Sequence, residues 1–511
     1  MASRNKRPEL RFMVKTSMDD FRPADRKLIR SHVMKGKNLG RARPLGSRRY
    51  RELTNERANV VSSSSNTDAS HHDGNHGSAS LSQSISGSLP HSEDQIGIQA
   101  PESIPSLFGS PASTMYLADS VNPAVLEVVL HLSSIAKQLL FSIEKCMFFD
   151  RRAENWLAPL AVDPAFLHAK VFTSLYYFDV VLPRRSSHDN KHILYHYHTT
   201  VSLLRKRLLF DSDEIRLSNN TVSVILSLAS QAFRTGELKL ALHHMQGIRR
   251  IISLRGGLST FKGNEKLAAE ILRCDLGMAV HAGLDPVLLH DAALRDKYRT
   301  YPNLGIFLDE ENLKLSSQSC LFLDSSAATY GVEVDSRLAS TWSAMSDFCR
   351  VINLAAETQQ RIKVDTFLHS MASIMYSLLD MHFEESSWDE TIRLGLLSFS
   401  CSVFLPWSDL GTPLPHLHSI LKNHFANCAA STSFLPPKLL LWVLMASTIA
   451  TSVEPDNGWF YGLMHEAINL CEIKCWSQMR DILMSLMWIG IVHDGPGKSV
   501  FSTSTYCSYA Y

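Results

Sequence analysis

Three histidines, His188, His192 and His196, recur at every fourth residue, a spacing that places imidazole rings on one face of a helix. Imidazole nitrogen is a common zinc ligand, so the pattern raises the question of a metal site. One straight helix cannot arrange three rings tetrahedrally around an ion, and further ligands would have to come from other elements. We therefore predict a polar helix face here and not a metal site.

Cysteines supply a second set of candidate ligands. Cys471 and Cys475 lie four residues apart, with His465 upstream, and we interpret the two cysteines as small buried residues of an amphipathic helix. The three histidines within 71–76 stand in a stretch rich in Ser and Gly and reflect its composition. The sequence thus predicts no metal and no cofactor.

Residues 1–60 carry 17 Lys and Arg against 6 Asp and Glu, although the whole chain has a formal charge of +1. Such a basic segment can be recognised by a nuclear import receptor or can contact nucleic-acid phosphates, and its third interpretation is a solvated tail. It lacks the interleaved aromatic residues that stack on bases. The candidate contacts are its central basic residues: Arg26, Lys27, Arg30, Lys35, Lys37, Arg41, Arg43, Arg48 and Arg49.

Sequence signatures of common enzymes do not occur in this chain. It has no P-loop, dinucleotide-binding, Gly-x-Ser-x-Gly or His-Glu-x-x-His string. An all-α enzyme could hold Mg²⁺ between carboxylates of facing helices, but the one Asp-Asp pair, Asp19-Asp20, lies in the basic segment. We predict that the protein is not an enzyme.

A short string, Arg255-Gly256-Gly257-Leu258, offers two interpretations. Its glycines can form a backbone nest for an anion, or they can end a helix, with Leu258 folding back onto the last turn. We favour helix termination.

The charged pair Arg273 and Asp275 follows on the next predicted helix. Residues two apart cannot face each other along a helix, so we expect each to pair with a neighbouring helix.

Apolar residues recur at helical spacing over most of residues 119–495, and strand-like alternation is scarce, with 318–324 the one weak candidate. We predict an all-α, multi-helix antiparallel array. The predicted helices are 122–139, 165–182, 188–209, 218–234, 236–255, 265–283, 335–357, 364–383, 388–404, 437–453 and 459–491.

Composition divides the chain into four parts. The basic segment 1–60 precedes a linker, 61–118, that is rich in Ser, His and Gly and has no Lys or Arg over 61–115, a composition typical of disorder. The helical domain 119–495 follows, and 496–511 is expected to be an irregular tail.

The cysteine and hydropathy patterns indicate in which cellular compartment the protein resides. The nine cysteines all lie at or after Cys146 and form no disulfide framework, which favours a reducing compartment. The longest apolar run, 439–453, is shorter than the roughly 20 residues of a membrane-spanning helix. We expect a soluble intracellular protein that does not enter a membrane.

Two sequence blocks together resemble the fungal-specific transcription factor domain family. One is the string IRSHVMKGKNLGRAR at 29–43, and the other is GELKLALHHMQGIRRIISLRGGL at 236–258, followed by LRCDLGMAVHAG at 272–283. The resemblance implies an all-α regulatory domain. Related regulators carry an N-terminal binuclear zinc cluster of six cysteines, whereas no cysteine precedes Cys146 here, so zinc is not expected.

From this resemblance we expect a nuclear transcription regulator that controls a metabolic gene set, such as a secondary-metabolite cluster. Its expected partners are a nuclear import receptor and transcriptional partner proteins, and direct contact with DNA stays open. The alternative is a helical adaptor that recruits a DNA-bound partner without binding DNA itself.

Overall fold

A computed structural model of the protein describes residues 117–119, 121, 123–139, 143–148, 158–178, 190–329, 333–385, 387–405, 414–429, 435–451 and 458–506. The basic segment 1–60 and the linker 61–118, apart from 117 and 118, lie outside the described residues. The nine basic residues proposed for import or phosphate contact, from Arg26 to Arg49, are therefore also outside the described residues.

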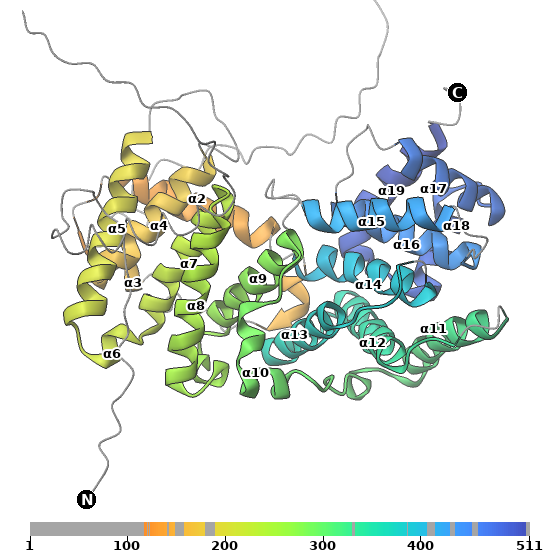
Figure 1. Ribbon diagram of the computed structural model, residues 1–511, viewed down its shortest axis with the longest axis horizontal. Helices are drawn as coiled ribbons and strands as arrows, with labels where there is room; N and C mark the ends of the chain where they lie inside the picture. The colour runs from red at the N-terminus through yellow and green to blue at the C-terminus, as the bar shows by residue number, and fades with distance from the viewer. Residues whose placement is uncertain are drawn as a thin grey trace, which may run out of the picture. The chain divides into compact units, whose positions relative to one another are not determined.

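The described residues are almost entirely helical, which confirms the predicted all-α class. In the first half of the body (Figure 1) the helices are α2 (Pro123–Leu139), α3 (Ala158–Val162), α4 (Pro164–Tyr176), α5 (Asn190–Phe210), α6 (Asp213–Arg216), α7 (Asn219–Arg234), α8 (Leu238–Arg255) and α9 (Glu265–Ala282), with 3-10 turns η2 (Glu144–Cys146) and η5 (Leu258–Phe261).

The second half continues in the same manner. Its elements are η6 (Val287–His290), α10 (Ala292–Lys297), η7 (Gly305–Phe307), α11 (Glu310–Thr329), α12 (Ser336–Thr358), α13 (Val364–Asp380), α14 (Trp388–Phe404), α15 (Pro415–Ala429), α16 (Pro437–Thr451), α17 (Gly458–Leu470), α18 (Trp476–Leu486) and α19 (Gly490–Tyr506).

Local sequence signals start several of these helices. Asp163 accepts a hydrogen bond from the Phe166 N–H at 3.0 Å and precedes Pro164, so α4 has both an N-cap and a proline in its first turn. Ser218 caps α7 in the same way, accepting from the Thr221 N–H at 3.2 Å. These side chains satisfy N–H groups that have no partner within the helix.

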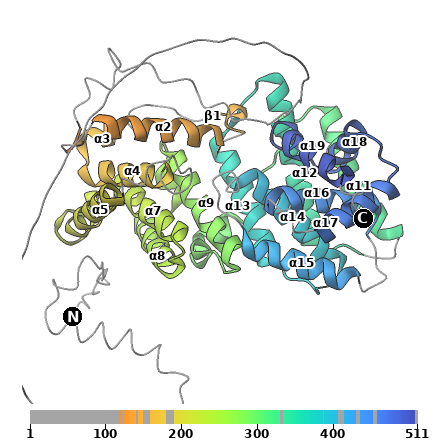
Figure 2. The same ribbon diagram turned by 90° about the horizontal axis from the view of Figure 1, so that it is seen from above.

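Many of the helices pack against one another in pairs. α4 lies against α5, α7 against α8 and α14 against α16, and three residues join α7 to α8, so these two run antiparallel. The α14–α16 contact is close: a Cβ added at Gly395 would lie 2.8 Å from a methyl group of Val443. Figure 2 shows α9 beside α13, on the side of α13 that faces the α7–α8 pair.

Strand structure in the described ranges is confined to two short segments. β1 (Met147–Phe148) and β2 (Ile362–Lys363) pair in parallel, with Met147 opposite Ile362. The weak strand candidate 318–324 was wrong, because these residues belong to α11. There Ser319 is buried and accepts a hydrogen bond from the Trp342 indole of α12 at 3.1 Å.

The predicted helix 459–491 is interrupted. α17 ends at Leu470 and α18 begins at Trp476, and Glu472 between them has a φ of 53°. Cys471 is half-buried in this turn, and Cys475 is exposed immediately before α18. Our interpretation of both cysteines as buried residues of one helix was therefore wrong.

The chain end also differs from our expectation of an irregular tail over 496–511. α19 continues to Tyr506 with Pro496 inside it, and 507–511 lie outside the described residues. Gly497 allows this helix to pack closely, since an added Cβ would lie 2.8 Å from the rings of both Trp476 and Trp488. Ser- and Thr-rich composition hid this helix from sequence reasoning. No helix within the described ranges is long and apolar enough to cross a membrane.

Candidate ligand-binding pocket

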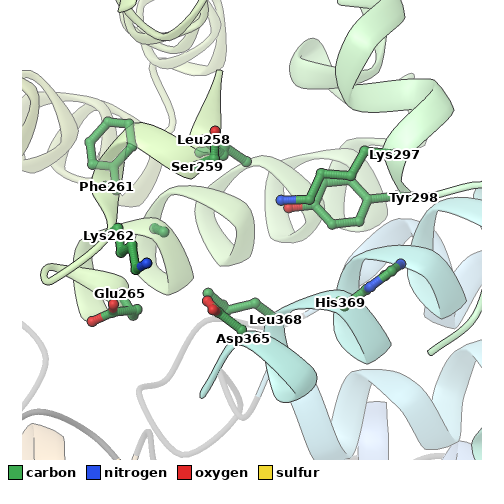
Figure 3. A pocket seen from close by; sticks show the side chains of 11 residues that line it. Leu258, Ser259, Phe261, Lys262, Glu265, Lys297, Tyr298, Asp365, Leu368 and His369 are labelled. Atoms are coloured by element: carbon green, nitrogen blue, oxygen red, sulfur yellow. The ribbon is translucent and has the colours of Figure 1, made fainter. Parts of the chain in front are cut away.

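A pocket of about 330 Å³ opens among four elements of the body, η5, α9, α10 and α13 (Figure 3). Its size lies at the lower end of the roughly 300–1,000 Å³ of small-molecule sites. The lining residues are Leu258, Ser259, Phe261, Lys262, Glu265, Ala268, Lys297, Tyr298, Asp365, Leu368 and His369.

The end of α8 shapes one wall of this pocket. Gly256 adopts a left-handed conformation with φ 93°, and the Gly257 N–H donates to the Ile252 carbonyl at 2.9 Å. This pattern closes the helix and turns the chain into η5, where Leu258 is buried and lines the pocket. The predicted helix termination is thus confirmed.

Arg255 fixes the same wall. Its guanidinium donates to the Asn219 side-chain oxygen at 2.8 Å and to the Thr260 carbonyl at 3.1 Å. It also lies over the Phe261 ring, 4.0 Å from the ring centroid. One side chain therefore joins the start of α7 to η5, so the first residue of the Arg-Gly-Gly-Leu string positions the pocket wall.

Asp275, a buried residue of α9, supports the pocket wall opposite η5. It is 2% exposed, and its carboxylate accepts hydrogen bonds from the Val287 N–H at 2.7 Å, the Leu288 N–H at 3.2 Å and the Tyr376 hydroxyl at 3.2 Å. These bonds tie α9 to η6 and α13. Burial raises the pKa of Asp275 from 3.8 to about 7, although the three hydrogen bonds and the charge of Arg249 lower it.

Arg273 contacts the same neighbouring helix. Its guanidinium lies 5.6 Å from the centroid of the Phe367 ring, on α13. Arg273 thus contacts α13, and Asp275 bonds to η6 and α13, so both members of the Arg-x-Asp pair reach neighbouring elements.

Tyr298 connects this buried network to the pocket. Its ring lies 6.1 Å from that of Tyr376 and 5.7 Å from that of His369, and the His369 Nε2 bonds to the Thr300 carbonyl at 2.8 Å. Burial and, to a smaller extent, the Asp365 carboxylate raise the pKa of Tyr298 to about 12. A tyrosine hydroxyl is protonated at neutral pH, and the raised pKa keeps it so in more basic solution, so it can donate to a ligand.

Charges of both signs surround the opening. Lys262, Lys297 and Asp365 are exposed, and none of them joins an ion pair within the described part of the chain. Figure 3 shows the two lysine side chains pointing toward the pocket from opposite sides. The pocket thus presents cationic and anionic groups above an apolar floor.

A second polar cluster involves histidines that the sequence had grouped differently. His196 is buried, and its Nδ1 lies 2.7 Å from the Nδ1 of His168 on α4, whose Nε2 lies 3.1 Å from an Asp119 oxygen. Burial and the neighbouring His168 lower the pKa of His196 to about 4. His192 is exposed, and His188 lies outside the described residues.

The predicted polar face is therefore wrong at His196, which packs inward. Sequence reasoning missed the pairing because His168 and His196 are 28 residues apart on different helices. Within the described ranges, no three His, Cys, Asp or Glu side chains are placed to hold a metal ion.

A serine–histidine pair, the half-buried Ser402 and the buried His493, has the residue types of a nucleophile and base. The His493 Nδ1 accepts the Ile489 N–H at 3.2 Å, so the ring proton is on Nε2 and is donated to the Ser402 oxygen at 3.0 Å. Ser402 in turn donates to the Phe399 carbonyl at 2.6 Å. Because Nε2 carries the proton, this ring cannot deprotonate the serine, and the pair has a structural role.

Comparisons with protein-family models, with curated proteins and with solved structures found no match to this chain.

Proposed function

We propose that this chain is a nuclear transcription regulator of the fungal-specific transcription factor domain type, without a binuclear zinc cluster. The observation that carries the proposal is that two segments of the chain, 236–258 and 272–283, support the elements around one pocket. The block ending in Arg255-Gly256-Gly257-Leu258 forms one wall, and the Arg273–Asp275 helix anchors the elements opposite. These segments make up the second of the two blocks on which the family resemblance rests, and they are set in the all-α body that it implies. The first block, 29–43, lies outside the described residues.

In this proposal the basic segment and the helical body have different roles. The basic segment 1–60 binds a nuclear import receptor and contributes sequence-independent phosphate contacts. The helical body binds transcriptional partner proteins at the promoters of a metabolic gene set. The protein acts without a metal or cofactor and catalyses no reaction.

The second candidate function is a helical adaptor that never touches DNA. It is favoured by the lack of any cysteine before Cys146, since a six-cysteine zinc module cannot be formed there. The adaptor would reach chromatin through a DNA-bound partner.

Nuclear import can be tested with matched triple variants of the full chain. We expect Ala at Lys35, Lys37 and Arg41 to reduce nuclear accumulation. Ala at Lys191, Arg205 and Lys206, exposed basic residues of α5, should leave it unchanged. Equal accumulation of both variants, together with failure of residues 1–60 to carry a reporter into nuclei, would refute the import role.

The salt dependence of binding to duplex DNA tests direct DNA contact. Affinity for duplex DNA should fall steeply as salt rises, because each neutralised phosphate releases counterions. Binding that is absent even at low salt would leave the adaptor.

A further inference from the structure

We propose that the pocket between η5 and α13 binds a free α-amino acid with an apolar side chain. The binding itself goes beyond the proposed function. Only the idea that the bound amino acid regulates transcription rests on that function.

The charges of the pocket select a zwitterion. Lys262 and Lys297 reach the opening from η5 and α10, and Asp365 comes from the first turn of α13. Two ammonium groups suit a ligand carboxylate, and the Asp365 carboxylate suits a ligand ammonium. A simple anion would face Asp365, and a simple cation would face both lysines. A molecule that carries both charges pairs with these three residues. The fourth charged lining residue, Glu265, accepts the Gly263 N–H at 2.6 Å.

The floor of the pocket selects the rest of the ligand. Leu258, Phe261, Ala268 and Leu368 are buried apolar side chains that line it. Such a surface favours an aliphatic or aromatic side chain over a polar one. A volume of about 330 Å³ leaves room for a single amino acid and excludes a long ligand from full enclosure.

The Tyr298 hydroxyl adds a directional contact. The residue is 5% exposed and lines the pocket, and its phenolic hydroxyl is a hydrogen-bond donor. Its ring is held beside Tyr376, which is bonded to Asp275. The pocket walls are therefore positioned before a ligand arrives, which lowers the ordering cost of binding.

The test is calorimetric titration of the full chain with L-leucine and L-phenylalanine. We expect at least one of them to bind. For the better ligand, the analogue lacking the carboxylate, the analogue lacking the ammonium and the N-acetyl amide should each bind at least tenfold more weakly. Failure of both amino acids to bind, or equal affinity for the N-acetyl amide, would overturn the proposal.

Exposed residues provide the matched variants. Asp365→Asn and Lys297→Met should each weaken binding at least tenfold, whereas Asp296→Asn, an exposed neighbour on α10 that does not line the pocket, should not change it. Unchanged affinity in the first two variants would overturn the assignment. Chromatin association, measured in cells that express the full chain, separates the two claims. Its presence without amino acid binding would refute this proposal alone.

Discussion

Asp275 is a buried carboxyl that holds three elements together, and replacing it with asparagine tests how the pocket is supported. The folded-state pKa of about 7 lies above the unfolded value of 3.8, so the folded protein binds this proton more tightly. The resulting stabilisation is fully present below pH 3.8 and is lost as the pH rises through 7. Between pH 5 and pH 8 linkage gives a loss of about 2–3 kcal/mol for this one group.

Asp275→Asn removes the titration but keeps the shape of the side chain. One carboxyl oxygen of Asp275 accepts from the Val287 N–H, and the other accepts from the Leu288 N–H and the Tyr376 hydroxyl. In asparagine an NH₂ group replaces one of these oxygens and cannot accept, which costs about 1–3 kcal/mol. The variant should therefore be clearly less stable than the parent at pH 5. At pH 8 the difference should shrink by about 2–3 kcal/mol, because the parent then carries a buried charge.

Urea unfolding of both proteins at the two pH values measures this difference, and the contributions of titrating groups that the two proteins share cancel between them. Asp296→Asn, an exposed carboxyl on α10, serves as the matched control and should show no pH-dependent difference from the parent. If the Asp275→Asn difference is the same at pH 5 and pH 8, the buried carboxyl is not protonated more readily in the folded state, and the reasoning fails.

Four further substitutions test the fold. Burial lowers the pKa of His493 to about 3, below the unfolded 6.5, so its contribution to stability is lost as the pH falls; in urea unfolding, His493→Gln should lose about 2 kcal/mol less than the parent between pH 7 and pH 5. Gly256→Ala should cost about 1–2 kcal/mol because φ is 93°, while Gly462→Ala, exposed within α17 with open space around it, should add about 0.5–1 kcal/mol, both read from unfolding midpoints. Gly395→Ala should lower the melting temperature through a loss of about 1–3 kcal/mol, because its Cβ meets Val443 at 2.8 Å; an unchanged melting temperature would contradict the α14–α16 packing.

Much of the helical body could be predicted because most of the long helices carry a periodic apolar face and end signals, although α11, α15 and α19 were not predicted. Gly256 shows this well, since one glycine after a periodic run fixed the end of α8. The helix α15 was missed although Leu414, Leu417, Leu421 and Phe425 are buried at helical spacing, so a signal was present. Local composition misled where tertiary contacts decide, as in α19, whose Gly497 packs against two tryptophan rings.

The candidate site was less accessible to sequence reasoning. Arg255 and Asp275 were singled out from their strings, but their roles depend on partners such as Asn219 and Tyr376, which are 36 and 101 residues away. Lys297 and Asp365 gave no signal at all, because isolated charged residues are common on any surface. Only the packing of α9, α10 and α13 brings them to one opening.

The central claim is that the protein acts on chromatin and is directed there by its basic segment. Genome-wide occupancy of the full chain, compared with a chain that lacks residues 1–60, tests it most directly. The account predicts discrete promoter occupancy for the full chain and its loss on deletion. Absence of occupancy with the full chain, or identical occupancy without residues 1–60, would contradict it.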